Sequence, residues 1–150
     1  MLKWHWRTFS ELTNFELYDI LALRQDVFNL EQHCTEPDID HFDQKAMHLL
    51  GVQNDQLVSY LRVFLPGNRY SDATSIGRVV TARSARGHGL GRAAMAQTLA
   101  YLHSNHVAAP ILISAQAYLE KFYMSYGFKQ IGDPFDEAGI LHIPMRKEYL

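Results

Sequence analysis

The sequence predicts a mixed α/β domain in which one sheet combines parallel and antiparallel strands. Strand-like runs open and close the chain, and two helix-like segments in its second half each separate one strand-like run from the next. Strand–helix–strand connections are the usual crossovers of parallel strands, whereas a tight turn joins antiparallel neighbours. A chain of 150 residues is long enough to bury one core, so residues 1–150 are expected to form a single domain.

In the first half of the chain the pattern favours a strand, a long helix and a hairpin. Alternation predicts a strand at Trp4–Thr8, and Thr13 is a suitable N-cap for a helix that runs to about Leu30. Asn54-Asp55 favours a tight turn between two strand-like runs. These two runs are Ala46–Gln53 and Gln56–Leu65.

The predicted first helix carries an arginine on its apolar face. At about 100° per residue, the apolar face comprises Leu17, Ile20, Leu21, Leu23, Val27 and Phe28. Arg24 falls in the middle of this face, where a solvated charge is not expected. The side chain should therefore have a buried partner or line a cleft.

The second half of the chain favours strands that alternate with two helices. Pro66–Asp72 is a loop rich in turn formers, and Gly127 is a suitable stop for the second of these helices. The expected strands are Ser75–Thr81, Pro110–Ala115, Phe128–Gly132 and Ile140–Arg146. The expected helices run from Gly89 to about Ser104 and from Tyr118 to Tyr126. The complete order is β-α-β-β-β-α-β-α-β-β.

Composition argues against several classes of protein. The net charge of −2 lacks the basic excess of a nucleic-acid-binding protein, and 20% charged with 12% aromatic residues argues against disorder. No apolar run approaches the roughly 18 residues of a membrane span, and the N-terminus lacks the apolar region of a secretory signal. Cys34 is the only cysteine, which excludes an internal disulfide. We therefore expect a cytoplasmic protein with no membrane partner and no metal centre.

Charge is distributed unevenly along the chain. Between Asp72 and Glu120 there is no acidic residue, but four arginines lie there: Arg78, Arg83, Arg86 and Arg92. The stretch from residue 31 to residue 43 has no lysine or arginine, and its acids are Glu31, Glu36, Asp38, Asp40 and Asp43. One interpretation is a basic site for an anion and an acidic site for a cation, and the other is that exposed loops collect charge by chance.

The sharpest local feature is a glycine-rich turn between an expected strand and an expected helix. Its sequence is Arg86-Gly87-His88-Gly89-Leu90-Gly91-Arg92. Glycines let the backbone approach a ligand closely, and the free amides of a helix start favour an anion such as phosphate. The dinucleotide motif would need glycine in place of Arg92, and the Walker A loop would need Lys-Ser or Lys-Thr after its last glycine. Both common nucleotide motifs fail, which leaves another anion site or a plain surface turn.

Three features together resemble the GNAT superfamily of acyl-CoA N-acyltransferases. The turn matches the Gln/Arg-x-x-Gly-x-Gly/Ala loop of that family, and the element order matches along essentially the whole chain. A second motif, similar to the family's Phe-Tyr-x-x-x-Gly-Phe, is Phe122-Tyr123-Met124-Ser125-Tyr126-Gly127-Phe128. Within the superfamily, five short segments resemble the small bacterial ElaA-type branch. They are Arg24-x-x-Val27-Phe28, Glu31-Gln32, Asp38-x-Asp40, Ala115-Gln116-Ala117 and Gly139-Ile140-x-His142-Ile143.

The resemblance implies acetyl-CoA as the acyl donor. In the family, the strand before the loop pairs with the extended pantetheine arm, and the corresponding residues here are Val79, Val80 and Thr81. The pyrophosphate lies on the loop, which here comprises Arg86, Gly87, His88, Gly89, Leu90, Gly91 and Arg92. Gln116 stands where many relatives carry a cofactor-side asparagine. Tyr123 matches the usual general acid for the departing thiolate, and the alternative for this residue is a place in the core.

The resemblance does not identify the general base. An amine must lose a proton before it attacks a thioester, and Ser75 occupies the strand position where some relatives carry glutamate. The candidates elsewhere are Glu31, Asp43, His48 and His142. On the acceptor side we expect Arg24, Glu31, Asp38 and Asp40. Arg24 would pair with one of the carboxylates and order the wall of the cleft, and the other carboxylates would attract a cationic amine.

These residues predict an N-acetyltransferase that moves an acetyl or other acyl group from acetyl-CoA to an amine by direct attack in a ternary complex. The acceptor is a small molecule or a protein amine, and the sequence specifies neither it nor the oligomeric state. One alternative is a non-catalytic acyl-CoA-binding sensor. The other is acyl transfer to a small metabolite, because Arg24-x-x-Val27-Phe28 resembles a motif of autoinducer synthases, which share the GNAT core.

Overall fold

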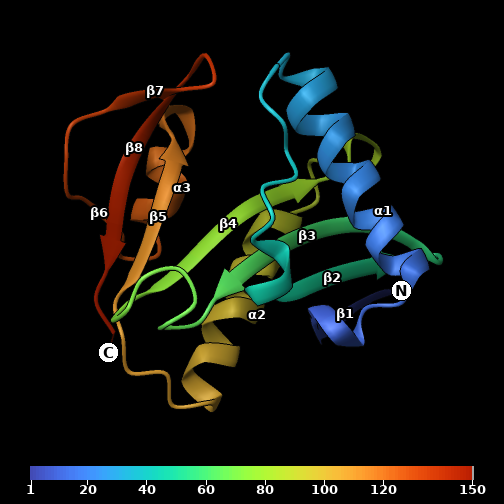
Figure 1. Cartoon of the computed structure of the whole chain (residues 1–150), viewed down its shortest axis with the longest axis horizontal. Helices are drawn as coiled ribbons and strands as arrows, with labels where there is room; N and C mark the ends of the chain where they lie inside the picture. The colour runs from blue at the N-terminus through green and yellow to red at the C-terminus, as the bar shows by residue number, and fades with distance from the viewer. Residues whose placement is uncertain (150) are drawn as a thin grey trace.

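The computed structural model describes residues 1–149, which form one mixed sheet with helices on both faces (Figure 1). The strand order is β1-β2-β3-β4-β5-β8-β6, and β7 also pairs with β8. The strands are β1 (Leu2–Thr8), β2 (Met47–Gln53), β3 (Gln56–Phe64), β4 (Thr74–Thr81), β5 (Ile111–Gln116), β6 (Lys129–Gln130), β7 (Phe135–Glu137) and β8 (Ile140–Lys147). The β4–β5 pair is parallel, and the other described pairs are antiparallel.

Helices cover the two faces of the sheet unequally. The α-helices are α1 (Asn14–Arg24), α2 (Leu90–Ser104) and α3 (Glu120–Met124). The chain of α1 continues into η2 (Gln25–Glu31), a π-helical turn. Short 3₁₀ turns are η1 (Phe9–Glu11), η3 (Asp43–Lys45), η4 (Arg83–Ala85) and η5 (Ala117–Leu119). In Figure 1, α1 lies in front of β2, β3 and β4, whereas α2 and α3 lie behind the sheet. Within residues 1–149 no helix is both long and apolar enough to cross a bilayer.

The predicted mixed α/β fold is confirmed, and its long elements lie close to the predicted positions. The β2–β3 hairpin turns at Asn54 and Asp55, as expected. Both residues have left-handed φ values, 51° and 60°, which a two-residue hairpin turn requires. Thr13 is the N-cap of α1, also as expected.

Other boundaries differ from the prediction. The helix expected to reach Leu30 is α-helical only to Arg24 and then widens into η2. The helix expected over Tyr118–Tyr126 is a 3₁₀ turn followed by a helix that ends at Met124. The strand expected at Phe128–Gly132 contracts to β6, and β7 has no counterpart in the prediction. All residues of β6 and β7 are exposed, so neither strand carries the alternation that reveals a strand in a sequence.

Each face of the sheet buries its own core. Under α1 and η2, the buried residues are Ile20, Leu23, Val27, Leu50, Tyr60 and Val80. On the opposite face, Met95 of α2 and Tyr123 of α3 join a larger core that includes Ile113 and Met145. The first core therefore fixes α1 against β2, β3 and β4, and the second fixes α2 and α3 against both halves of the sheet.

A reciprocal capping box begins α1. The side-chain oxygen of Thr13 accepts the backbone N–H of Glu16 at 3.0 Å, and Glu16 Oε1 accepts the backbone N–H of Thr13 at 2.9 Å. Two of the amides that a helix start leaves free are thereby satisfied. The box fixes the start of the helix that places Arg24 in its last turn.

Strands β4 and β5 pair only briefly and then diverge. Their register ends at Ser75 and Leu112, although β4 continues to Thr81 and β5 to Gln116. Just beyond the last pair, a register shift against β3 places Arg78 in a bulge with a left-handed φ of 51°. A bulge bends its strand, and this one marks the point where β4 leaves β5. Beyond it, within the described residues, the facing edges of these two interior strands have no strand partner.

Replacing Thr13 with alanine should lower the free energy of unfolding by about 1 kcal/mol, because the first turn of α1 loses a capping acceptor. Urea unfolding monitored by circular dichroism measures the change. Thr13→Ser keeps the hydroxyl and should stay close to the wild type. A Thr13→Ser variant as unstable as Thr13→Ala would show that the hydroxyl is not what stabilises the helix start.

Candidate active site

The glycine-rich turn lies at the end of β4, beside the free edge of that strand. Gly87 and Gly89 have left-handed φ values of 84° and 76°, a conformation that favours glycine. Gly89 is the N-cap of α2, so amides of the first helical turn lack helical partners. Leu90 anchors the turn in a small apolar cluster with Val58 and Ala85. Free amides and a helix N-terminus at one place are the components of an anion site.

Two arginines that precede these glycines are paired with acids of η2. Arg83 forms an ion pair with Asp26. Arg86 binds Glu31 in bidentate fashion, with Nη1 and Nη2 each 2.6 Å from a carboxylate oxygen. The Arg86–Glu31 pair joins the basic segment of the chain to the acidic one. Asp26 and Glu31 therefore neutralise Arg83 and Arg86, which leaves the backbone amides as the anion-binding groups of the turn.

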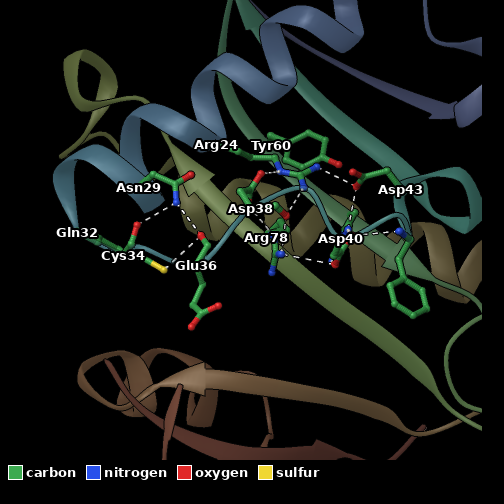
Figure 2. A network of polar contacts seen from close by, with 12 residues as sticks. Arg24, Asn29, Gln32, Cys34, Glu36, Asp38, Asp40, Asp43, Tyr60 and Arg78 are labelled. Atoms are coloured by element: carbon green, nitrogen blue, oxygen red, sulfur yellow. Dashed lines mark hydrogen bonds and ion pairs between the residues drawn. The ribbon is translucent and has the colours of Figure 1, made fainter. Parts of the chain in front are cut away.

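A network of three arginines and three aspartates, buried at Arg24, Asp43 and Arg62 and half-buried at Arg78 and Asp40, lies beneath α1 (Figure 2). Its members are Arg24, Asp38, Asp40, Asp43, Arg62 and Arg78. Arg24 has 0% of its surface exposed. It donates from Nε to Asp38 at 2.7 Å and from Nη1 to Asp43 at 2.8 Å. The expectation that Arg24 has a buried carboxylate partner is thus confirmed, and there are two such partners.

The other two arginines extend the network to β3 and β4. Arg62 of β3 donates from Nη1 to Asp43 at 2.8 Å and to Asp40 at 3.0 Å. Arg78 of β4 approaches Asp38 at 2.8 Å and Asp40 at 3.5 Å. The carboxylates that were expected on the acceptor side are therefore shared among arginines. Arg24 contacts no solvent in this arrangement, and the role that the geometry gives it is to order the chain from residue 38 to residue 43.

The network keeps Asp40 and Asp43 ionised. Burial opposes the charge of Asp43, but hydrogen bonds from Arg24 and Arg62 outweigh it and hold the pKa of Asp43 below its usual range. The same balance lowers the pKa of Asp40, mainly through Arg62. A carboxyl whose folded-state pKa is lowered stabilises the fold above its unfolded pKa of about 3.9 and loses that contribution as the pH falls. A carboxylate whose pKa is lowered is also a weaker base than an ordinary one.

His48 is fully buried, and both of its ring nitrogens have partners. Nε2 lies 2.9 Å from the carbonyl oxygen of Asp43, so the hydrogen-bond network assigns the proton to Nε2. Nδ1 then accepts the hydroxyl of Tyr60 at 2.6 Å. Burial lowers the pKa of His48, which keeps the ring neutral. The ring holds η3 against β3 and leaves no free nitrogen for a substrate.

Three of the four general-base candidates are thus tied into the structure. Glu31 is held by Arg86, Asp43 lies between two arginines, and His48 has both nitrogens occupied. Their assignment as base remains a prediction, but each would first have to break these contacts. Within residues 1–149, no group of three or more His, Cys, Asp or Glu side chains is placed to hold a metal ion.

His142 is the candidate with a ring nitrogen that no donor occupies. It lies on β8 directly opposite Gln116 of β5. Its Nδ1 is 2.8 Å from the carbonyl oxygen of Ile140, and because that oxygen can only accept, the contact assigns a proton to Nδ1. Nε2 lies 3.4 Å from Oε2 of Glu137, and Phe135 stacks on the ring at a centroid distance of 5.9 Å. These contacts orient the ring with Nε2 able to accept a proton.

Tyr123 combines a buried ring with a free hydroxyl. Its ring, on α3, belongs to the larger core and makes edge contacts with Phe122 and Phe128. Burial raises the pKa of Tyr123 to about 12, so the hydroxyl is protonated at neutral pH. Within the described part of the chain the hydroxyl makes no side-chain or backbone hydrogen bond. The geometry therefore allows both roles that the sequence leaves open, because the ring packs while the hydroxyl can donate.

Two features of the site escape the sequence analysis. Gln116, expected beside the cofactor, forms an amide pair with Gln32 of the η2 segment. Arg62 belongs to the buried network as fully as Arg24 does. The sequence does indicate a partner for Arg62, because this charged residue lies inside an apolar strand-like run. A charge buried there needs a partner of opposite sign, as it does at Arg24. No sequence pattern indicates that Gln32 and Gln116 meet.

Comparison with known proteins identifies relatives over the whole described chain. Residues 19–149 match the sequence model of the acetyltransferase (GNAT) domain. A UPF0039 protein of Synechocystis sp. is 41% identical over 145 residues, which cover 96% of this chain and 94% of that protein. Protein ElaA of Escherichia coli is 37% identical over 100% of this chain and 99% of its own length.

Solved structures give the same result. An acyl-CoA N-acyltransferase from Pseudomonas aeruginosa superposes with a TM-score of 0.93 at 37% identity, covering 98% of this chain and 99% of that one. The crystal structure of Escherichia coli ElaA gives a TM-score of 0.91 at 36% identity, with coverage of 99% and 100%. A CoA-dependent acyl-homoserine lactone synthase reaches a TM-score of 0.82 at 16% identity, over 100% of this chain and 84% of that one, which shows a shared fold alone. The predicted resemblance to GNAT proteins and their ElaA-type branch is confirmed.

Asp43→Asn should destabilise the fold by about 3–5 kcal/mol, because it removes one charge from a buried network and leaves two guanidinium groups short of a partner. The midpoint of urea unfolding at neutral pH measures the loss. Asp26→Asn, which breaks the exposed pair with Arg83, is the matched control and should cost clearly less. Equal losses in the two variants would show that the buried network does not support the fold.

Proposed function

The chain belongs to the GNAT acetyltransferase family and is an acyltransferase, and from this premise we propose that it transfers an acetyl group from acetyl-CoA to an amine. The acceptor amine, of a small molecule or a protein, attacks the thioester directly while donor and acceptor are both bound. The observation that carries the proposal is the free edge of β4 beside the glycine-rich turn.

The free edge of β4 supports the donor site. Val80 and Thr81 pair with β3 along one edge of the strand, and the opposite edge has no strand partner within residues 1–149. An extended pantetheine arm can pair with such an edge as an added strand, through main-chain hydrogen bonds of Val79–Thr81. At the same end of β4, the amides of Gly87–Gly91 and the start of α2 suit the pyrophosphate.

In the proposed reaction, the amine nitrogen bonds to the thioester carbonyl carbon, and the C–S bond then breaks with its electron pair on sulfur. A backbone amide of Val79–Thr81 donates to the carbonyl oxygen, where negative charge develops. His142 receives the amine proton on Nε2, the position that its Nδ1 contact leaves available.

Tyr123 is proposed as the donor to the departing thiolate. Because the pKa of Tyr123 is about 12, the hydroxyl is fully protonated when the donor binds. A thiol has an ordinary pKa of about 8.5, so the phenolate formed by proton transfer is the stronger base and regains a proton from solvent. Much of the benefit therefore comes from the hydrogen bond to the developing negative charge on sulfur.

Gly89→Asp should lower the affinity for CoA at least tenfold, because it places a carboxylate and a Cβ atom where the pyrophosphate is expected to approach. Isothermal titration calorimetry with CoA measures the effect. Gly67→Asp is the matched control, since Gly67 also has a left-handed φ and open space around a Cβ atom but lies in the β3–β4 loop. Unchanged CoA affinity in a folded Gly89→Asp variant would remove the donor-site assignment.

Tyr123→Phe and His142→Gln should each lower kcat by about 10²–10⁴-fold, the usual range for a general acid or base, with little change in acetyl-CoA affinity. The assay follows thiol release from acetyl-CoA over a library of amines, and mass spectrometry identifies the product. Tyr126→Phe is the control, because among residues 1–149 the Tyr126 hydroxyl bonds to the Arg92 carbonyl alone. Normal turnover in either variant would exclude the substituted residue as a general acid or base. If the wild type binds CoA but turns over no amine of the library, the protein is better described as an acyl-CoA sensor.

A further inference from the structure

Gln32 and Gln116 form a reciprocal amide pair that the proposed chemistry does not use. Gln116 Nε2 donates to Gln32 Oε1 at 3.1 Å, and Gln32 Nε2 lies 3.5 Å from Gln116 Oε1. Gln32 is the C-cap of η2, and Gln116 is the last residue of β5. Both side chains are half-buried. The pair therefore connects the segment that follows α1 to the strand on the far side of the divergence.

The position of this pair in the fold is unusual. Within residues 1–149, two sets of side-chain hydrogen bonds join the chain before β5 to the chain from β5 onward. One is the Gln32–Gln116 pair, and the other runs from the Tyr126 hydroxyl, in the turn after α3, to the Arg92 carbonyl of α2 at 3.2 Å. The second joins α2 to the turn that follows α3, and both of these helices lie behind the sheet (Figure 1). On the face of the sheet that α1 covers, the amide pair is thus the side-chain hydrogen-bonded link between the chain before β5 and the chain from β5 onward, within residues 1–149.

A continuous line of contacts leads from the glycine-rich turn to β5. Arg86, at the start of the turn, holds Glu31 through two hydrogen bonds of 2.6 Å. Glu31 precedes Gln32, and Gln32 holds Gln116. Figure 2 shows Gln32 beside the loop that carries Cys34 and Glu36, with β4 next to it. The ends of β4 and β5, which have no strand pairing between them, are therefore bridged by side chains.

We propose that the Gln32–Gln116 pair is a clasp that closes over the donor arm and opens when acyl-CoA enters or leaves. Gln32 is then a positioning residue for the donor. This inference rests on the proposed donor site along the free edge of β4. Because the pair joins the segment next to the turn to the end of β5, an arm laid on the free edge of β4 with its pyrophosphate at the turn would have to pass this pair. Two neutral hydrogen bonds are weak enough to break and re-form in each catalytic cycle.

A clasp acts on rates more than on affinity. Its closed state slows both entry and exit of the ligand, so its removal should raise the association and dissociation rate constants together, each by about tenfold. That factor corresponds to the loss of one or two neutral hydrogen bonds. The dissociation constant is the ratio of the two rate constants and should stay within about threefold. A direct contact between Gln116 and the cofactor would instead raise the dissociation rate alone and weaken binding.

The test is surface plasmon resonance of CoA and acetyl-CoA over the immobilised full-length protein. The variants are Gln32→Ala, Gln116→Ala and the double variant. Because the two amides form one contact, both single variants and the double variant should show the same rate constants. The control is Asn29→Ala, which removes bonds of 3.0 and 2.9 Å to the Cys34 and Glu36 carbonyls and so loosens the adjacent loop without touching the clasp. Its rate constants should stay within about twofold of the wild type.

The outcomes distinguish a failure of the clasp from a failure of the donor site. A parallel rise of both rate constants in the Gln32 and Gln116 variants, without that rise in Asn29→Ala, supports the clasp. Unchanged rates, a rise in dissociation alone, or an equal effect of Asn29→Ala overturns the clasp and leaves the donor site intact. No binding of CoA to the wild-type protein overturns the donor site and the clasp together. Thermal unfolding of each variant establishes that the compared proteins are folded.

Discussion

The pairing of buried arginines with buried aspartates is the constraint on which the rest of the site depends. Arg24 carries its charge where none of its surface is exposed, and such a charge is tolerated only when partners of opposite sign surround it. Asp38 and Asp43 supply those partners from the loop before β2. A residue of α1 thereby fixes a loop that apolar contacts alone would leave free to adopt many conformations. The same loop extends the network to β3 and β4, so four parts of the chain hold one another in place.

The network also bears on the divergence of the sheet. Arg78 has a left-handed φ within β4, a conformation that is strained for a residue with a side chain. Its ion pair with Asp38 offsets that strain and holds the bulge in place. The bulge follows the last β4–β5 pair, so the contact that anchors Arg78 helps to keep the edge of β4 free. On the other side of the network, η2 and its C-cap Gln32 carry the side chains that reach Arg83, Arg86 and Gln116. One stretch of chain thus contacts both the arginine network and the proposed donor site.

The sequence specifies the long elements and the need for a partner at Arg24, but not the identity of that partner. Asp38, Asp40 and Asp43 lie within a few residues of one another, and only the path of the loop determines which of them meets which arginine. The sequence likewise does not show which of the candidate general bases is available. His48 and His142 both lie on strands, yet His48 is enclosed by η3 and Tyr60, whereas β7 and Glu137 flank His142. Those neighbours come from β7, which is too short and too exposed to leave a periodic pattern in the sequence.

The charge balance of the network also limits how the acidic segment can act on an acceptor. Its three aspartates face three arginines, so the cluster has no excess negative charge with which to attract a cation. A cationic amine would have to displace an arginine from a buried carboxylate, which exchanges one satisfied ion pair for another and leaves a guanidinium unpaired. Glu31 is neutralised in the same way by Arg86. Glu36 is the acid of this segment with no ion pair within residues 1–149, and Glu137 lies at 59% side-chain exposure next to His142. If the proposed acceptor is cationic, acids other than these aspartates would have to attract it, because the aspartates are occupied by the arginines.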